Sequence, residues 1–366
     1  MHKVLNYGSA LQAYALQSVV EKMGFQCEII DYLYPNAYHL SLRPHLPVWK
    51  RIVLWIIQFL YGFPERKRER KFRSFYRDFF HLSARQYRSK EEIAECPPRY
   101  DIYLTGSDQV WNPKYIGSDA TFMLSFVQGD APKISYSSSF ATDSVPREYV
   151  DLYRECLKGY SSISVREQGG VEIVRGLTGQ DAEVVLDPTM LLLAEEYDSI
   201  AERSSIQIDE PYILAYILGY SFNPYPYVEE LIRHVRKKTG YKVCLLNVSN
   251  VKMLFEKDTC RLQDVGPAEF VYLFRHAAFV ITTSFHGTAF SINFQKPFYS
   301  LLSRGNRDDR LASLLSFCGL SDRAVYMGQE FPADINMESS SASVEKLQRL
   351  REKSLEVLKK GLVCPF

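Results

Sequence analysis

The fold is decided by one stretch of the sequence, Phe279-Val280-Ile281-Thr282-Thr283-Ser284-Phe285-His286-Gly287. Its first five residues form a short, mainly apolar run without alternation, which predicts a strand buried on both faces of a parallel sheet. Residues 284–287 then supply a tight turn, and Thr288 to Phe294 predicts a helix. A strand that turns directly into a helix is the building unit of a doubly wound α/β domain.

The same alternation extends outward from this stretch. Further elements are predicted as strands at Tyr212–Ile217, Lys242–Leu246 and Phe298–Leu301, and as helices at Pro226–Thr239 and Pro267–Ala277. We therefore predict a C-terminal Rossmann-like domain at residues 211–335. A terminal helix follows it within residues 344–366.

The N-terminal part repeats the pattern. Ser9 suits the N-cap of a helix at Ala10–Met23. Apolar runs predict strands at Cys27–Asp31, Ile102–Leu104, Lys133–Tyr136, Ile163–Val165 and Val184–Leu186. These runs predict a second Rossmann-like domain at residues 1–200, with a polar linker from Ala194 to Glu210. The predicted fold class is thus α/β, with two doubly wound domains facing a cleft in which a small molecule could bind.

Length and composition agree with this fold class. A chain of 366 residues suits two domains with separate cores, and a hydrophobic fraction of 46% excludes a disordered chain. The seven cysteines form no Cys-x-x-Cys pair, so they indicate neither a zinc site nor a disulfide framework. Because the N-terminus lacks the zones of a signal peptide, we expect a cytoplasmic protein.

Residues 43–90 form a basic and apolar helical insertion in the N-terminal domain. They hold 13 Lys and Arg against 3 Asp and Glu, a balance of +10, which leaves −9 for the rest. Val48 to Phe63 is apolar but too short to span a bilayer, and the basic stretch Glu65–Arg77 follows. The charge balance suits an anionic lipid or a nucleic acid. The apolar segment beside it favours peripheral contact of residues 48–77 with an anionic membrane, at the inner face of the plasma membrane, and we expect no nucleic-acid partner. A helical hairpin packed on the N-terminal domain is the alternative.

His286 stands at the predicted strand-to-helix turn, beside a helix N-terminus. Free backbone N–H groups there attract anions, and a histidine can hold a phosphate or carboxylate or transfer a proton. The flanking Ser284 and Gly287 suit a turn whose backbone approaches a ligand. A histidine hydrogen-bonded within the core is the alternative.

Other predicted strand ends also carry polar residues. Asp101–Pro113 includes one Trp and could grip sugar hydroxyls or only cap a helix. Ser164–Glu167 places an Arg where its fork could bind an anion or form a surface ion pair. Leu186–Thr189 also ends a strand, although Asp-Pro is often only a turn. Asn306 and Arg310 follow the next strand and could add to an anion pocket.

Taken together and in this order, the motifs closely resemble the polysaccharide pyruvyl transferase family. The matching motifs are Asn6–Gln17, Gly106–Asn112, Ser164–Glu167, Leu186–Thr189 and Ser284–Thr288. The resemblance covers roughly residues 2 to 325 and implies a fold like the two-domain glycosyltransferase-B type. It also implies a strand before the Asn6 loop, where only Met1 to Leu5 stand, so this first strand is expected to be missing.

The resemblance further implies a function in cell-surface polysaccharide biosynthesis, such as that of a capsule or exopolysaccharide. The donor would be phosphoenolpyruvate and the acceptor a lipid-linked sugar. The donor-binding residues would be Arg166, Ser284, Phe285, His286, Gly287, Asn306 and Arg310. The acceptor-binding residues would be Asn6, Tyr7, Gln12, Ser107, Asp108, Gln109 and Trp111. Some members carry a basic residue just before the histidine, where this chain has Ser284-Phe285, so Arg310 or another cation would supply that charge.

Ketal transfer from phosphoenolpyruvate needs a proton on the methylene carbon, attack by two sugar hydroxyls and loss of phosphate. We assign donor binding and proton transfer to His286, the anion clamp to Arg166, and the base for the acceptor hydroxyl to Asp108. This chemistry requires no metal and no cofactor besides the co-substrate. Because fold does not fix chemistry, two alternatives remain: a nucleotide-sugar glycosyltransferase of the same shape, or a non-catalytic, membrane-associated sugar-binding protein.

Overall fold

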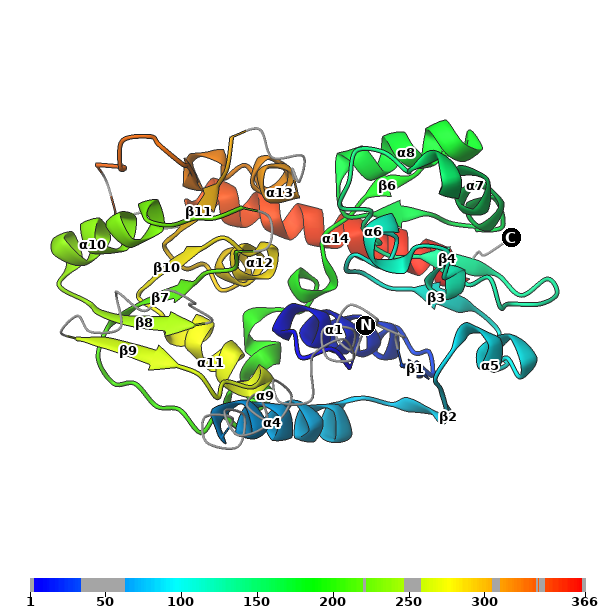
Figure 1. Ribbon diagram of the computed structural model, residues 1–366, viewed down its shortest axis with the longest axis horizontal. Helices are drawn as coiled ribbons and strands as arrows, with labels where there is room; N and C mark the ends of the chain where they lie inside the picture. Colours follow the sequence, from blue (N-terminus) through cyan, green and yellow to red (C-terminus); the bar gives the residue numbers. More distant parts are fainter. Residues whose placement is uncertain are drawn as a thin grey trace, which may run out of the picture.

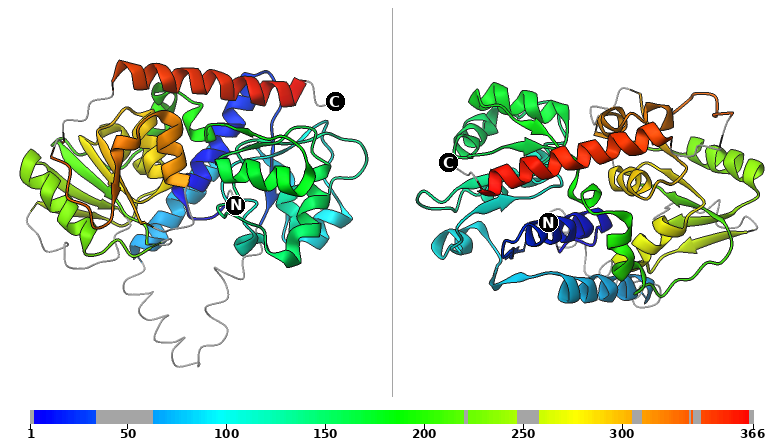
Figure 2. Two further views of the ribbon diagram at one scale, coloured as in Figure 1. Left: turned by 90° about the horizontal axis from the view of Figure 1, so that it is seen from above. Right: turned by 180° about the vertical axis from the view of Figure 1, so that it is seen from behind.

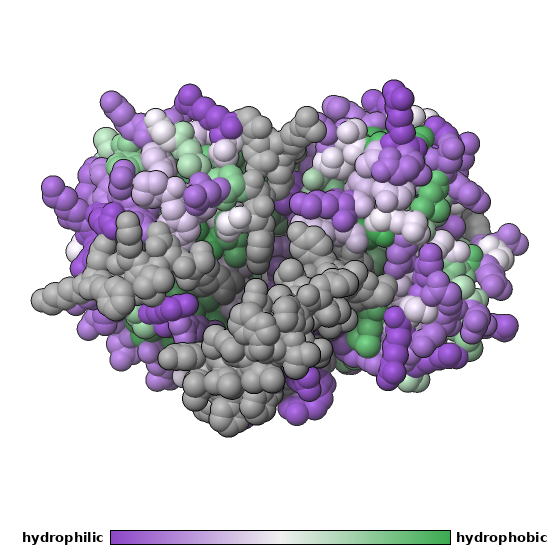
Figure 3. Space-filling view, in the orientation of Figure 1, coloured by the Kyte–Doolittle hydropathy of each residue, from purple (hydrophilic) through white to green (hydrophobic). Residues whose placement is uncertain are grey.

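The structure is a computed structural model that describes residues 3–33, 63–219, 222–246, 258–304, 310–333, 335 and 340–363. Two α/β halves lie side by side, with helix α1 (Tyr7–Lys22) between them (Figure 1). Hydrophilic side chains dominate the visible surface of both halves, with small apolar groups between them (Figure 3). Most of the large apolar side chains are buried in the interior.

The C-terminal half is built on one six-stranded sheet in which neighbouring strands are parallel. Its strands are β7 (Tyr212–Tyr216), β8 (Lys242–Leu246), β9 (Thr259–Leu262), β10 (Phe279–Thr282), β11 (Phe298–Leu302) and β12 (Ala324–Tyr326). Their order is β12-β11-β10-β7-β8-β9, so the chain reverses direction across the sheet between β7 and β10. Ligands of doubly wound sheets bind at such a switch point, outside the carboxyl ends of the strands.

Helices cover both faces of this sheet. They are α10 (Tyr227–Thr239), α11 (Pro267–His276), α12 (Phe285–Asn293) and α13 (Arg310–Cys318). Alternate residues of β7 face opposite sides: Ile213 packs with Leu231 of α10, and Leu214 lies in the cluster that contains Phe270 of α11. The half is therefore doubly wound, as predicted.

In the N-terminal half, the strands form separate two-stranded pairs instead of one continuous sheet. Its strands are β1 (Ile29–Tyr32), β2 (Leu82–Tyr87), β3 (Tyr103–Thr105), β4 (Lys133–Ser135), β5 (Ser164–Val165) and β6 (Glu183–Val184). They form three parallel pairs, β1-β2, β3-β4 and β5-β6, and single bridges join β4 to the β5 region. Residues 3–5 form a turn, and within the described ranges no strand joins β1 to β3.

This half contains the helices α5 (Lys90–Glu95), α6 (Pro113–Ile116), α7 (Val150–Lys158) and α8 (Gln168–Thr178), in addition to α1 and α4 (Phe63–Phe79). Helix α9 (Asp198–Ala201) lies against α11 of the other half, where Arg275 pairs with Asp198. Residues 48–62 of the predicted membrane segment lie outside the described residues. Among the described residues, no helix is long and apolar enough to cross a bilayer.

Helix α4 packs against the C-terminal half rather than only against its own. Phe72 of α4 is fully buried, and Lys71 Nζ lies 2.8 Å from Glu269 Oε1 of α11. Lys67 Nζ lies 2.5 Å from Asp264 Oδ2, and Arg68 donates to the Leu5 carbonyl. Part of the basic charge of this stretch is therefore paired with acidic residues of the C-terminal half, whereas the alternative expected packing on the N-terminal domain.

One core runs through both halves. It includes Leu11 of α1, Phe72 of α4, Phe270 of α11 and Leu358 of the terminal helix α14 (Ser341–Val363). Figure 2 shows α14 lying across both halves. Each half also has a core of its own, which includes Trp111 and Phe140 in the N-terminal half and Ile213 and Leu231 in the C-terminal half. The proposed division at residue 200 thus separates two sheets and two cores, while the shared core joins the halves.

Candidate active site

His286 is placed by the junction of β10 and α12. Ser284 caps α12, because its Oγ accepts from Gly287 N at 3.4 Å, and Ser284 N donates to Thr282 Oγ1 at 3.0 Å. A Cβ atom at Gly287 would lie 2.3 Å from Thr282 Oγ1, so only glycine fits this turn. His286 thus stands in the first turn of α12, whose leading N–H groups have no partner within the helix.

The N-terminus of α1 meets this turn from the other half. A Cβ atom at Gly8 would lie 2.0 Å from His286 Nδ1, so the glycine backbone lies directly against the imidazole ring. Asn6 caps α1, since its Oδ1 accepts from Ser9 N at 3.2 Å. The predicted loop at residues 6–9 and the predicted turn at 284–287 therefore lie together.

Asp187, with no exposed surface, joins the groups at this junction. Its Oδ2 accepts from Ser107 Oγ at 2.8 Å and from Arg166 Nη1 at 3.2 Å. The same oxygen lies 3.7 Å from His286 Nε2, close enough for an ion pair but too far for a direct hydrogen bond. Its Oδ1 accepts from both the backbone N and the hydroxyl of Thr189. One carboxylate thus connects the ends of β3, β5 and β6 with α12.

Asp108 is the second carboxylate of the site. It follows β3 with a positive φ of 79°, and its Oδ2 accepts from Ser9 Oγ of α1. Arg166 Nη2 lies 3.9 Å from its Oδ1. A non-glycine residue held in this backbone region carries strain, which in proteins concentrates at functional sites.

Both carboxyls are held in the charged form. Burial alone would raise the pKa of the Asp187 carboxyl, but contacts with His286 and Arg166 outweigh burial and hold the pKa well below its usual range. The pKa of Asp108 is also lowered, because Arg166 and His286 again outweigh the effect of burial. Two anions therefore surround one guanidinium and one imidazole at neutral pH.

Several donors of the site are left without a hydrogen-bond partner within the described part of the chain. They are Arg166 Nε, Arg166 Nη2 and His286 Nε2. The Arg166 side chain is only 1% exposed, and its guanidinium lies 4.2 Å from the centre of the Phe285 ring. Buried donors of this kind normally have a partner. The arrangement can therefore hold an anion beside the N-terminus of α12.

Acceptors without a partner lie at the same junction. Gln12 Oε1 of α1 is one, while its Nε2 donates to the Ser9 carbonyl. Glu167 Oε2, next to Arg166, is another. Such oxygens can accept hydrogen bonds from hydroxyl groups. Among the described residues, no group of three or more His, Cys, Asp or Glu side chains is placed to hold a metal ion.

The model of the polysaccharide pyruvyl transferase family matches residues 6–304, which include every element of this site. The chain belongs to the polysaccharide pyruvyl transferase family. It is therefore a transferase of a family that acts on polysaccharides. No curated protein sequence matches this member of the family.

Solved structures with a similar fold include sugar-nucleotide epimerases. UDP-GlcNAc 2-epimerase from Methanocaldococcus jannaschii in complex with UDP-GlcNAc and UDP matches with a TM-score of 0.51 at 12% identity, covering 94% of this chain and 89% of that chain. A second structure of the same epimerase matches with a TM-score of 0.50, the same identity and the same coverage. This pyruvyl transferase family member thus has a glycosyltransferase-B-like fold, as predicted.

The structure brings most predicted site residues of this pyruvyl transferase family member together. Those that meet around Asp187 are Ser107, Asp108, Arg166, Phe285 and His286, with Gln12, Ser284 and Gly287 beside them. Their functional roles stay predictions.

Other predicted residues lie elsewhere. Trp111 was expected to face the acceptor, but it is fully buried and its Nε1 donates to the Phe122 carbonyl. Tyr7 is also buried, stacks on Phe270 and donates to the Val265 carbonyl. Both expectations are wrong, because these aromatic rings fill cores instead of lining the site.

Three more predicted residues have local roles or lie apart. Gln109 Oε1 accepts from Asn112 Nδ2 at 2.9 Å. Arg310 begins α13, and Asn306 lies outside the described residues. The expected donor-binding roles of Asn306 and Arg310 and the expected acceptor-binding role of Gln109 stay predictions.

Asp187, Ser9 and Gly8 were not among the predicted site residues. All three lie in the motifs that carried the family resemblance, so the signal was present in the sequence. Asp187 was discounted because Asp-Pro commonly forms a turn, and it does begin a short 3-10 helix at 188–190. Its additional contacts with Arg166 and His286 depend on the three-dimensional structure.

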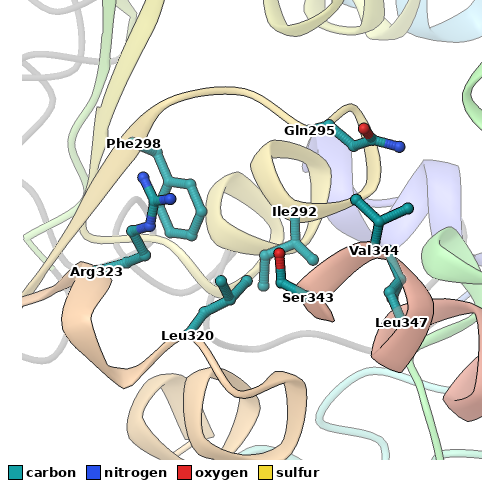
Figure 4. Close-up of a pocket in the computed structure, with 8 residues that line it drawn as sticks. All are labelled: Ile292, Gln295, Phe298, Leu320, Arg323, Ser343, Val344 and Leu347. Atoms are coloured by element: carbon teal, nitrogen blue, oxygen red, sulfur yellow. The ribbon is translucent and has the colours of Figure 1, made fainter. Parts of the chain in front are cut away.

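A separate hollow lies at the other end of α12. It is lined by Ile292, Gln295, Phe298, Leu320, Arg323, Ser343, Val344 and Leu347 (Figure 4). These residues come from the end of α12, from β11, from the segment after α13 and from the start of α14. His286 lies at the opposite end of α12, so this hollow is not part of the candidate site.

Proposed function

We propose that this protein transfers the pyruvyl group of phosphoenolpyruvate to two hydroxyls of a sugar, forming a ketal and releasing phosphate. The observation that carries the proposal is the set of unpartnered donors on Arg166 and His286. A buried guanidinium normally has all its strong hydrogen bonds made, so these donors fit a bound anion. Phosphoenolpyruvate offers two anionic groups, a phosphate and a carboxylate.

The charged groups of the site bind the donor on one side and activate the acceptor on the other. On the donor side, Arg166 and the N-terminus of α12 hold the anionic groups and stabilise the departing phosphate. On the acceptor side, the ionised Asp108 accepts a proton from the attacking hydroxyl. His286 is the proton source for the methylene carbon, because both neighbouring carboxyls are held deprotonated.

The reaction balances in the following way. A proton from His286 adds to the methylene carbon, and the first hydroxyl oxygen bonds to the adjacent carbon as its proton passes to Asp108. The bond between that carbon and the phosphate oxygen then breaks, and phosphate leaves with the electron pair. The second hydroxyl closes the ketal. One of the two hydroxyl protons replaces the proton that His286 gave to the methylene carbon, and the other leaves with phosphate.

Phosphate release from phosphoenolpyruvate tests the proposal. We expect release that depends on a lipid-linked sugar acceptor, and a loss on the order of a hundredfold in kcat/KM for Arg166→Lys and for His286→Ala. Arg175→Lys, on the exposed face of α8, is the matched control and should keep wild-type activity. Because lysine preserves the charge beside Asp187, we expect the Arg166→Lys variant to fold. Its thermal transition checks this expectation.

The alternatives give different products. A nucleotide-sugar glycosyltransferase would release nucleotide from an activated sugar, and a sugar-binding protein would turn over neither donor. Either result with pure wild-type protein would overturn the pyruvyl transfer proposal.

We further propose that the acceptor is carried on a lipid at the cytoplasmic face of the membrane. The exposed cation Arg70 of α4 supports this, while Lys67 and Lys71 face Asp264 and Glu269. Charge reversal at Arg70 should weaken cosedimentation with anionic vesicles, and added salt should do the same. Binding that ignores both changes would contradict an electrostatic contact.

A further inference from the structure

Arg351 is a buried cation outside the site. It lies on α14, is 7% exposed, and uses its guanidinium on three elements. Nε donates to the Met190 carbonyl at 2.8 Å, Nη2 to Asn293 Oδ1 at 3.0 Å, and Nη1 to Gln348 Oε1 at 2.9 Å. Arg351 therefore ties the terminal helix to α12 and to the segment that follows Asp187.

Asn293 continues this connection from the last turn of α12. Its Nδ2 donates to the carbonyls of Thr189 and Leu192, at 2.9 and 3.0 Å. The first turn of the same helix carries His286. A shift of α12 along its axis would therefore break the contacts of Asn293 and displace His286 together.

Thr189 closes the connection to the site. Its backbone N and its hydroxyl donate to Asp187 Oδ1 at 3.0 and 2.7 Å. On the other side of the aspartate, Leu186 N donates to Ser354 Oγ of α14 at 3.0 Å. The terminal helix thus holds the Asp187 segment at two points, and this segment holds Arg166.

The chemistry of Arg351 favours a role in geometry over one in stability. Its direct hydrogen-bond acceptors are all neutral oxygens. Burial lowers the pKa of Arg351, and the more distant Glu196, Glu195 and Tyr197 act against this without offsetting it. A buried cation without a direct anionic partner is costly, whereas its forked shape fixes three elements at defined distances.

We propose that Arg351 and Asn293 form a strut through which the C-terminal helix sets the positions of Asp187, Arg166 and His286. Arg351 is thus a positioning residue that touches no substrate. The kinetic part of this inference rests on the proposed function. The structural part does not depend on the reaction.

The kinetic test compares Arg351→Met with Arg349→Met, an exposed arginine on the same helix. In folded protein, we expect Arg351→Met to lower kcat/KM for phosphoenolpyruvate by tenfold to a hundredfold, which is on the order of the loss that small misplacements of catalytic groups cause. Arg349→Met should leave kcat/KM unchanged. Asn293→Leu, which removes the middle of the strut, should cause a similar loss. The double variant should lose little more than either single variant.

A structural role alone would give a different result. Arg351→Met and Asn293→Leu would then lower the thermal transition but keep wild-type kcat and KM at temperatures where they are folded, and this would overturn the strut. Asn293→Leu also covers the case in which Arg351→Met does not fold.

Hydrogen exchange separates this inference from the proposed function. We expect the amides of Asp187, Thr189 and Met190 and those of residues 285–288 to exchange faster in Arg351→Met than in Arg349→Met. If wild-type protein released no phosphate from phosphoenolpyruvate, the proposed function would fail while this measurement still decided on the strut. Equal exchange at both segments in the two variants would overturn it.

Discussion

The two halves of the molecule join their parallel strands in different ways. In the C-terminal half, a continuous backbone ladder joins six parallel strands. In the N-terminal half, only isolated backbone bridges join β4 to the β5 region, and side chains add contacts at the carboxyl ends of these short strands. Ser138 Oγ donates to the Gly106 carbonyl at 2.9 Å, and Glu167 Oε1 accepts from Ser139 Oγ, Phe140 N and Ala141 N.

The candidate site draws on both halves. His286 stands in the first turn of α12, directly after β10, an inner strand with a backbone ladder on each side. Asp108, Arg166 and Asp187 follow short strands and depend on one another for position. A single polar substitution should therefore disturb the N-terminal part of the site far more than the C-terminal part.

The largest expected effect comes from Asp187→Asn. The variant leaves the buried Arg166 without its closest anion, and breaking a buried pair of this kind costs about 3–5 kcal/mol. Urea unfolding measures the loss. Asp181→Asn, an exposed aspartate that pairs with Arg175, should change stability by less than about 1 kcal/mol. Equal losses in the two variants would show that the Asp187 cluster does not hold the N-terminal half together.

The second effect comes from Glu167→Ala, which removes the acceptor for three donors next to Arg166. Leaving buried donors unpaired costs about 1–3 kcal/mol each, partly relieved where water enters, so we expect a net loss of about 2–3 kcal/mol. Glu172→Ala, on the exposed side of α8, is the control. If both variants unfold at the same urea concentration, side chains do not join the strand pairs in the way described.

The third effect is a dependence on pH. Because the folded pKa of Asp187 is lowered, its stabilising contribution is complete above the unfolded value of about 3.9 and is lost as pH falls toward the folded value. Stability of the wild type should therefore decline more steeply than that of Asp187→Asn as pH is lowered from about 6 to about 3. Parallel declines would contradict a depressed pKa at this residue.

The smallest effect is expected in the C-terminal half. Thr288 Oγ1 donates to the Ser284 carbonyl and also contacts Ser300 Oγ. Thr288→Val keeps the shape and should cost only about 1 kcal/mol, because the backbone ladder of β10 and β11 is untouched. A loss as large as that of Asp187→Asn, measured in the same urea titration, would remove the contrast between the halves.

The sequence predicted the inner strands well. The apolar runs at β7, β8, β10 and β11 are long enough to indicate strands buried on both faces. The strands β2, β9 and β12 were missed, and each lies at the edge of its sheet. Edge strands need fewer apolar residues, so β2, which reads Leu82-Ser83-Ala84-Arg85-Gln86-Tyr87, carries little strand signal.

The candidate site was predicted in part. His286 and Arg166 follow strands, and the carboxyl ends of strands are where ligands of such sheets bind, so position alone indicated them. Asp187 was missed because its role depends on contacts between residues far apart in sequence. Trp111 was assigned to the acceptor because it stands in a polar run, and Tyr7 because it lies in a motif of the family. Neither pattern reveals which way a ring points.

Transfer of isotopically labelled pyruvyl carbon tests the central claim most directly. Pure protein is incubated with carbon-labelled phosphoenolpyruvate and a lipid-linked sugar acceptor, and the acceptor is examined by mass spectrometry. Pyruvyl transfer predicts a labelled ketal on the acceptor with wild-type protein, the same product with Arg175→Lys, and none with His286→Ala. An acceptor that stays unlabelled with wild-type protein, while an activated sugar loses its nucleotide, would contradict it.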